Sequence, residues 1–173
     1  MNKNQMLLPF AEREYVDMPR ACRILGASWT AVVGMAASGY LRLVDYRRNG
    51  HKRVHYATLV EHCNRLREEY AIPDRRPALA CELLRYRDED ILPFALRDTI
   101  GIADAAPMLG YLAKWTATRL CEEGRFESYR LHPCAPWRIS LSSLRLYIHG
   151  AVTGDKPPDD IDKLSERTKL TTL

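Results

Sequence analysis

A pattern of glycine, apolar and basic residues occurs twice in this chain of 173 residues, and this repeat constrains the fold more than any other feature. The matching positions are Leu25-Gly26, Gly39, Arg53-Val54 and Leu59 in the first copy, and Leu109-Gly110, Gly124, Arg138-Ile139 and Leu144 in the second. From the second glycine onward the offset between the copies is 85 residues throughout. A duplicated small unit with basic side chains around a turn favours binding over catalysis.

The positive charge of the chain is concentrated in the two copies. Residues 15–66 hold eight Lys or Arg against three Asp or Glu, and residues 99–149 hold six against four. The stretch between them, 67–98, holds six against eight, and the whole chain carries +4. This distribution indicates a polyanionic partner for each copy, with a solvated connector between them.

Several classes of protein are disfavoured by the composition. No apolar run approaches the roughly 20 residues that cross a bilayer, and residues 1–10 lack a signal-peptide layout, so we expect no membrane association and a cytoplasmic, bacterial or phage nucleoid-associated protein. The five cysteines form no CxxC pair, which favours free thiols over a metal site or disulfides. No nucleotide-binding, hydrolase or metalloprotease motif occurs and the histidines are scattered, so we expect no enzyme, no cofactor and no metal.

The first copy predicts helices, a hairpin and a closing helix, in that order. Asp17 caps a helix over Pro19–Leu25, and Gly26 ends it; Ser28 or Thr30 caps a second helix that runs to about Ser38. The sequence around Asn49-Gly50 is a strong hairpin signal. The remaining elements predicted for this copy are strands over Tyr40–Val44 and Arg53–Tyr56 and a helix over Leu59–Tyr70, capped by Thr58.

The second copy repeats the plan, with one extra residue after Gly110. It predicts helices over Ile102–Leu109 and Lys114–Glu123, strands over Phe126–Leu131 and Trp137–Ser140, and a helix from Ser142 to His149. Short helices over Leu79–Arg87 and Asp90–Leu96 are predicted to bridge the copies. The expected organisation is an N-terminal extension (1–14), a first unit (15–70), a helical connector (71–98), a second unit (99–149) and a mobile tail (150–173).

The repeated positions resemble the DNA-binding domains of the excisionase and MerR-type families. The resemblance covers roughly 100 residues and is carried by Ala21, Leu25, Gly26, Gly39, Leu41, Arg53, Val54 and Leu59, and by Ala105, Leu109, Gly110, Gly124, Phe126, Arg138, Ile139 and Leu144. It implies a mainly α fold with small β-hairpins, made of two tandem winged helix-turn-helix units. In such units the second helix enters the major groove, and the hairpin wing contacts the backbone or the minor groove.

In the first unit the wing is the stronger candidate for DNA binding. Its cationic side chains are Arg47, Arg48, His51, Lys52 and Arg53, although an ordinary solvated turn is the alternative. The second helix offers Ser28, Trp29 and Thr30, with Val33 and Gly34 beside them, where the families often carry Arg, Tyr or Gln. We expect Trp29 to pack into the connector rather than to stack on sugar. The first unit would then bind DNA mainly through its wing, or use this apolar face for a protein partner such as a recombinase.

In the second unit the second helix is the stronger candidate. It offers Lys114, Trp115, Thr118, Arg119 and Glu122 as a base-reading set, and Arg to guanine is the commonest specific contact. A merely solvated Arg119 is the alternative. The wing carries only Arg130, His132 and Arg138, and Trp137 is expected to pack between wing and helix.

These observations favour a double-stranded DNA-binding protein that acts as a transcriptional regulator or as an excisionase-like architectural factor. Two linked units on one chain would let a monomer bind as a pseudo-dimer, rather than as an obligate oligomer. The differences between the two units predict a non-palindromic target. The alternative is a protein–protein interaction module that has kept the fold without binding DNA.

Overall fold

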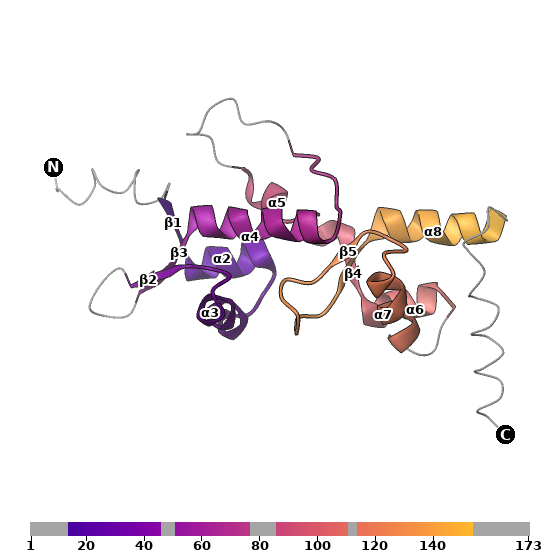
Figure 1. Cartoon of the computed structure of the whole chain (residues 1–173), viewed down its shortest axis with the longest axis horizontal. Coiled ribbons are helices and arrows are strands. Elements are labelled where there is room, and N and C mark those ends of the chain that lie inside the picture. The colour runs from indigo at the N-terminus through magenta and orange to yellow at the C-terminus, as the bar shows by residue number, and fades with distance from the viewer. Residues whose placement is uncertain (1–13, 46–50, 77–85, 111–113, 154–173) are drawn as a thin grey trace, which may run out of the picture.

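The computed structural model describes residues 14–45, 51–76, 86–110 and 114–153, and it contains two successive runs of the same elements (Figure 1). The first unit consists of β1 (Tyr15–Asp17), α2 (Met18–Leu25), α3 (Trp29–Ala37), β2 (Leu43–Asp45), β3 (Lys52–His55) and α4 (Tyr56–Glu69). The connector contains α5 (Asp88–Ile91) and a 3₁₀ turn, η1 (Leu96–Asp98). The second unit consists of β4 (Thr99–Gly101), α6 (Ile102–Met108), α7 (Lys114–Glu122), β5 (Ser128–Tyr129), β6 (Arg138–Ser140) and α8 (Leu141–Thr153).

Each unit contains a small antiparallel sheet of three strands, in the orders β1-β3-β2 and β4-β6-β5. The central strands pair at equivalent positions: Val54 lies opposite Val16 and Leu43, and Ile139 lies opposite Ile100 and Ser128. The expected hairpins are therefore present, but each has gained a strand from just before the first helix of its unit. The extra strand stabilises the hairpin, since two strands alone are marginal in water.

The backbone conformation of four glycines at turns is the same in the two units. Gly26, Gly39, Gly110 and Gly124 all have positive φ, from 55° to 80°, and they occupy equivalent places in the two units. Only glycine adopts this left-handed conformation at little cost, so it ends the helix before each turn. At the other end of α2, Asp17 Oδ1 accepts from the Arg20 amide at 2.7 Å. Ser28, not Thr30, caps α3, since its Oγ accepts from the Ala31 amide at 3.2 Å.

Two helix predictions need correction at their starts. The helix expected from Leu59 begins at Tyr56, directly after β3, and α8 likewise begins at Leu141. Thr58 is not the cap of α4. Its hydroxyl donates to the His55 carbonyl at 2.8 Å and accepts from the Arg42 amide at 3.1 Å, which ties the start of the hairpin to the helix.

The helix predicted over Asp90–Leu96 is wrong. The connector instead forms α5 for a single turn, and Leu92 is then extended, with ψ 159°. Leu92 precedes Pro93, whose ring disfavours a helical conformation in the residue before it. The helix predicted over Leu79–Arg87 falls mainly on residues 77–85, outside the described residues.

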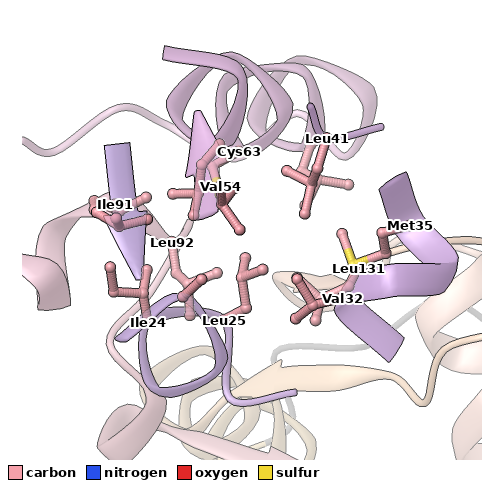
Figure 2. Close-up of a cluster of buried hydrophobic side chains, with 14 of the residues drawn as sticks. Ile24, Leu25, Val32, Met35, Leu41, Val54, Cys63, Ile91, Leu92 and Leu131 are labelled. Atoms are coloured by element: carbon pink, nitrogen blue, oxygen red, sulfur yellow. The ribbon is translucent and has the colours of Figure 1, made fainter. Parts of the chain in front are cut away.

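The connector is attached to the first unit by a buried arginine. The Arg67 guanidinium, on α4, donates to the carbonyls of Asp90, Ile91 and Leu92. Ile91 and Leu92 are themselves buried in the core of the first unit beside Ile24 (Figure 2). At the surface, Arg20 and Asp88 form an ion pair at 2.8 Å that joins α2 to α5.

The core of the first unit also contains residues of the second unit. Tyr129, which has no exposed surface, and Leu131, which is 4% exposed, belong to the same cluster as Val32 and Met35. Leu131 lies beside these two α3 residues, in the interior of the first unit (Figure 2). The hairpin of the second unit, between β5 and β6, is thus embedded in the first unit rather than free in solvent.

Figure 1 shows the two units in succession along the long axis of the molecule. Helices α4 and α8 run in the same direction along this axis, and the α2–α3 and α6–α7 pairs lie on the same side of it. On that side the order is β2–β3 hairpin, α3, β5–β6 loop, α7. The units are therefore related mainly by a translation, and not by a two-fold axis that would reverse one of them.

Candidate nucleic-acid interface

Helix α3 presents an apolar surface to solvent. Val32 and Met35 point into the core, and Trp29, at the first position of the helix, is 50% exposed. The expectation that Trp29 packs into the connector is therefore not met. Between Trp29 and Ala37 there is no charged residue, and a Cβ placed on Gly34 would meet no atom of the residues that the structure describes within 4 Å. This helix can approach another surface closely, but it offers few groups that read bases, namely Ser28 and Thr30.

Helix α7 presents the polar side chains that the first unit lacks. Lys114 is exposed and Trp115 is 56% exposed, while Thr118 and Arg119 are half-buried along the same helix. The Thr118 hydroxyl donates to the Lys114 carbonyl at 3.2 Å. Four of the predicted base-reading residues are thus brought together on one helix, and none of them lies beneath another part of the described chain.

An acidic neighbour that sequence reasoning missed accompanies Arg119. The Arg119 Nε donates to Glu123 at 2.6 Å, and Glu123 also accepts from Arg125 Nε at 3.3 Å. The hydrogen bond from Arg119 lowers the pKa of Glu123. The i, i+4 spacing was the signal for this pair. An exposed ion pair of this kind contributes only about 0–1 kcal/mol, so a nucleic-acid acceptor can compete with Glu123 for the guanidinium.

The first predicted wing is the β2–β3 hairpin, and only part of it lies within the described residues. Arg47 and Arg48 lie outside the described residues, and His51 is exposed. Lys52 and Arg53 are half-buried in β3. Because successive side chains in a strand alternate, Lys52 lies on the face of Val54 and Arg53 on the opposite face of the sheet. The described part of this hairpin therefore offers cations on both faces.

The second predicted wing binds protein instead of projecting into solvent. The Arg138 guanidinium donates to the Gly26 carbonyl at 2.8 Å and to the Tyr129 hydroxyl at 3.4 Å. Arg130 donates to the Pro133 carbonyl at 3.0 Å, and its guanidinium lies 4.6 Å from the centre of the Trp137 ring. Both arginines, assigned to DNA on the sequence alone, are engaged within the chain. His132, the third member of the set, is half-buried.

The contacts of this hairpin with the first unit are specific. His62 Nε2, on α4, lies 2.8 Å from the Leu131 carbonyl and hydrogen-bonds to it. Burial lowers the pKa of His62, so the ring is neutral at pH 7 and Nε2 is its donor. Trp137 is 6% exposed and meets the Tyr70 ring edge-on at 5.6 Å. The packing role expected of Trp137 is confirmed, with a first-unit residue among its partners.

The described cysteines Cys22, Cys63, Cys121 and Cys134 form no disulfide with one another. Burial raises the pKa of the Cys63 thiol to about 12 and that of Cys121 to about 11. Cys134 is exposed on the loop of the second hairpin, and Cys81 lies outside the described residues. Cys63 and Cys121 are thus unreactive core residues.

No protein-family model, curated protein or solved structure matches the chain. In the ranges that the structure describes, no helix combines the length and apolar character needed to cross a membrane.

Proposed function

We propose that the chain is a sequence-dependent double-stranded DNA-binding protein, in which each unit acts as a winged helix-turn-helix. The order of elements supports this proposal. In both units a short strand, two helices joined at a glycine of positive φ, a two-stranded hairpin and a third helix follow one another. In this architecture the second helix of each unit, α3 or α7, is the one that docks in the major groove.

The observation that carries the proposal is the placement of α3 and α7. Both helices start with an exposed tryptophan in their first turn and lie on the same side of the long axis (Figure 1). The major groove is about 12 Å wide and admits one helix, so one duplex running along the molecule can meet both. The net charge of +4, with the positive charge concentrated in the two units, favours a polyanionic partner.

The two units contribute differently to binding. Helix α7 supplies Lys114 and Arg119, which can reach guanine, whereas α3 has a smooth surface suited to close contact with sugar and thymine methyl groups. Lys52 and Arg53 of the first hairpin supply phosphate contacts. This chemistry suits a transcriptional regulator or an excisionase-like architectural factor, and a measurement of DNA bending by the bound protein separates the two.

The experiment uses the whole chain, because the units share a core. Duplexes selected from a random library identify the site, and affinity is then measured for Arg119→Ala and for Arg145→Ala, a matched change at an exposed position of α8. We expect Arg119→Ala to reduce discrimination at one base pair by about 1–3 kcal/mol, while Arg145→Ala leaves it unchanged. Equal effects of the two variants, or no sequence preference in the wild type, would refute the proposal.

Salt dependence tests the phosphate contacts separately. For each phosphate neutralised, the slope of log affinity against log salt concentration changes by about −0.9 on duplex DNA. Lys52→Ala should therefore weaken binding to all sequences alike and make the slope shallower by about one contact. A slope near zero in the wild type would instead indicate that the chain binds a protein partner.

A protein partner on α3 is the second candidate function. Half of the Trp29 surface is exposed on a helix without charged residues, and such an aromatic side chain is a common anchor in protein interfaces. A Trp29→Ala variant that keeps its DNA affinity but loses a co-purifying recombinase would support this role.

A further inference from the structure

The contact between the two units joins surfaces that are not equivalent. Arg138 of the second unit binds the Gly26 carbonyl of the first, and a Cβ on Gly26 would lie 3.2 Å from the Arg138 Nη2. At Gly110, the repeat partner of Gly26, no atom of the described residues lies within 4 Å of the same point. A two-fold arrangement would pair equivalent surfaces, so this contact is heterologous and sets the units head to tail.

This arrangement is held by buried contacts and not only by the covalent connector. Tyr129 and Leu131 are inside the core of the first unit, and the Leu131 carbonyl binds the buried His62. Across the surface, Arg75 and Glu127 form an ion pair at 2.6 Å. The connector is attached to the first unit near α5, since Arg67 donates to the carbonyls of Asp90, Ile91 and Leu92. Because the two units share these buried contacts, we expect them to keep one relative orientation when they bind.

We infer that the target is a duplex with two different recognition elements in one fixed order, polarity and helical phase. The inference rests on the proposed function, and it follows from the head-to-tail contact. Because α4 and α8 run in the same direction and α3 and α7 lie on the same side of the long axis (Figure 1), we expect both elements to present the same groove face and direction. Helix α7 carries charged side chains and α3 carries none, so each helix suits a different base sequence. The two DNA recognition elements therefore cannot exchange places in the target.

A flexible pair of units predicts a different behaviour. With a flexible linker, the second unit can still reach its DNA recognition element when base pairs are inserted between the two elements. An insertion of about one helical turn, near 10 bp, returns that element to the same face of the duplex. A rigid pair cannot extend, so insertions of half a turn and of a whole turn are both expected to abolish the contribution of the second unit. The loss of such linked binding amounts to a factor of about 10²–10⁴ in affinity.

The experiment starts from the selected site of the intact chain, mapped by hydroxyl-radical footprinting. Four altered duplexes are then compared with it: the element under α7 reversed in place, the two elements exchanged, and insertions of about 5 and about 10 bp between them. We expect each alteration to weaken binding about 10²-fold or more. Recovery of affinity with the longer insertion, or equal binding of the reversed element, overturns the inference while DNA binding itself stands. If no duplex binds above the non-specific level, the proposed function fails as well.

A second measurement needs no DNA. Backbone ¹⁵N relaxation of the free chain gives a rotational correlation time for each unit. A common value for residues of β3 and β6 is expected from a rigid body. Two distinct values would show that the units move independently, and this result overturns the inference whatever the duplex series shows.

Discussion

Gly26 lies where the two units and the connector meet, and its replacement by alanine is the most informative single perturbation. Its φ of 55° is left-handed, and a Cβ there would lie 2.8 Å from both terminal carbons of Leu96 and 3.2 Å from Arg138 Nη2. Gly110 supplies the matched control, because it has φ 77° in the same place of the second unit and a Cβ there would meet no atom of the described chain within 4 Å.

The two substitutions share a backbone cost but differ in packing cost. Placing an L-residue in the left-handed region costs about 1–2 kcal/mol at either position. At Gly26 the side chain of Leu96 must also move, and Arg138 must lengthen or lose its bond to the carbonyl. Both neighbours are flexible side-chain ends near the surface, so we assign them about 1 kcal/mol together. Gly26→Ala is therefore expected to cost about 2–3 kcal/mol, and Gly110→Ala about 1–2 kcal/mol.

Urea denaturation measures this difference. With an unchanged m-value, the midpoint should fall further for Gly26→Ala than for Gly110→Ala. In thermal scans the extra 1 kcal/mol corresponds to about 2–4 °C for a chain of this size. If Gly110→Ala destabilises as much as Gly26→Ala, the contact of the second hairpin with the first unit contributes nothing, and the rigid head-to-tail arrangement loses its support.

Three further predictions concern buried groups. Arg67→Met leaves three connector carbonyls without a donor and should cost about 3 kcal/mol in urea denaturation, whereas the exposed Arg65→Met should change stability by less than about 0.5 kcal/mol. Burial lowers the pKa of His62 below 6.5. The folded chain therefore binds fewer protons than the unfolded one, and the stability that His62 contributes is complete above pH 6.5 and is lost as the pH falls towards the folded pKa. His62→Gln should flatten this loss, which is at most about 1.4 kcal/mol per pH unit, and an unchanged slope would contradict the assignment. Iodoacetamide should modify Cys134 much faster than Cys63 in the native chain, as peptide mass spectrometry will show; equal rates would mean that the core opens readily.

The repeat and most of the helices could be predicted from the sequence because their signals are local. Asp17 as a cap, Gly26 as a helix end and the apolar spacing between them define α2 without tertiary information. The same applies to α6 and α7, whose starts were predicted at the residues where they occur. The candidate recognition side chains Lys114 and Trp115 are exposed as expected, since α7 was placed correctly.

The remainder depends on contacts between distant residues. The strands β1 and β4 are three residues long, too short for an alternating pattern, and they exist only because a central strand offers a free edge. The second hairpin was predicted to be a DNA-binding wing because Arg130 and Arg138 are cationic. Its loop, however, contains Leu131 and two prolines where the first hairpin has arginines, and that apolar composition was the available signal of packing against protein.

The presence of Leu131 in the interior of the first unit has a consequence for folding during synthesis on the ribosome. During synthesis the amino-terminal half cannot complete its interior until the ribosome has released a segment three quarters of the way along the chain. Until then the part of α3 around Val32 and Met35 lacks the cover that Leu131 provides. The amino-terminal half is therefore expected to lack part of its core when it is produced as a separate fragment.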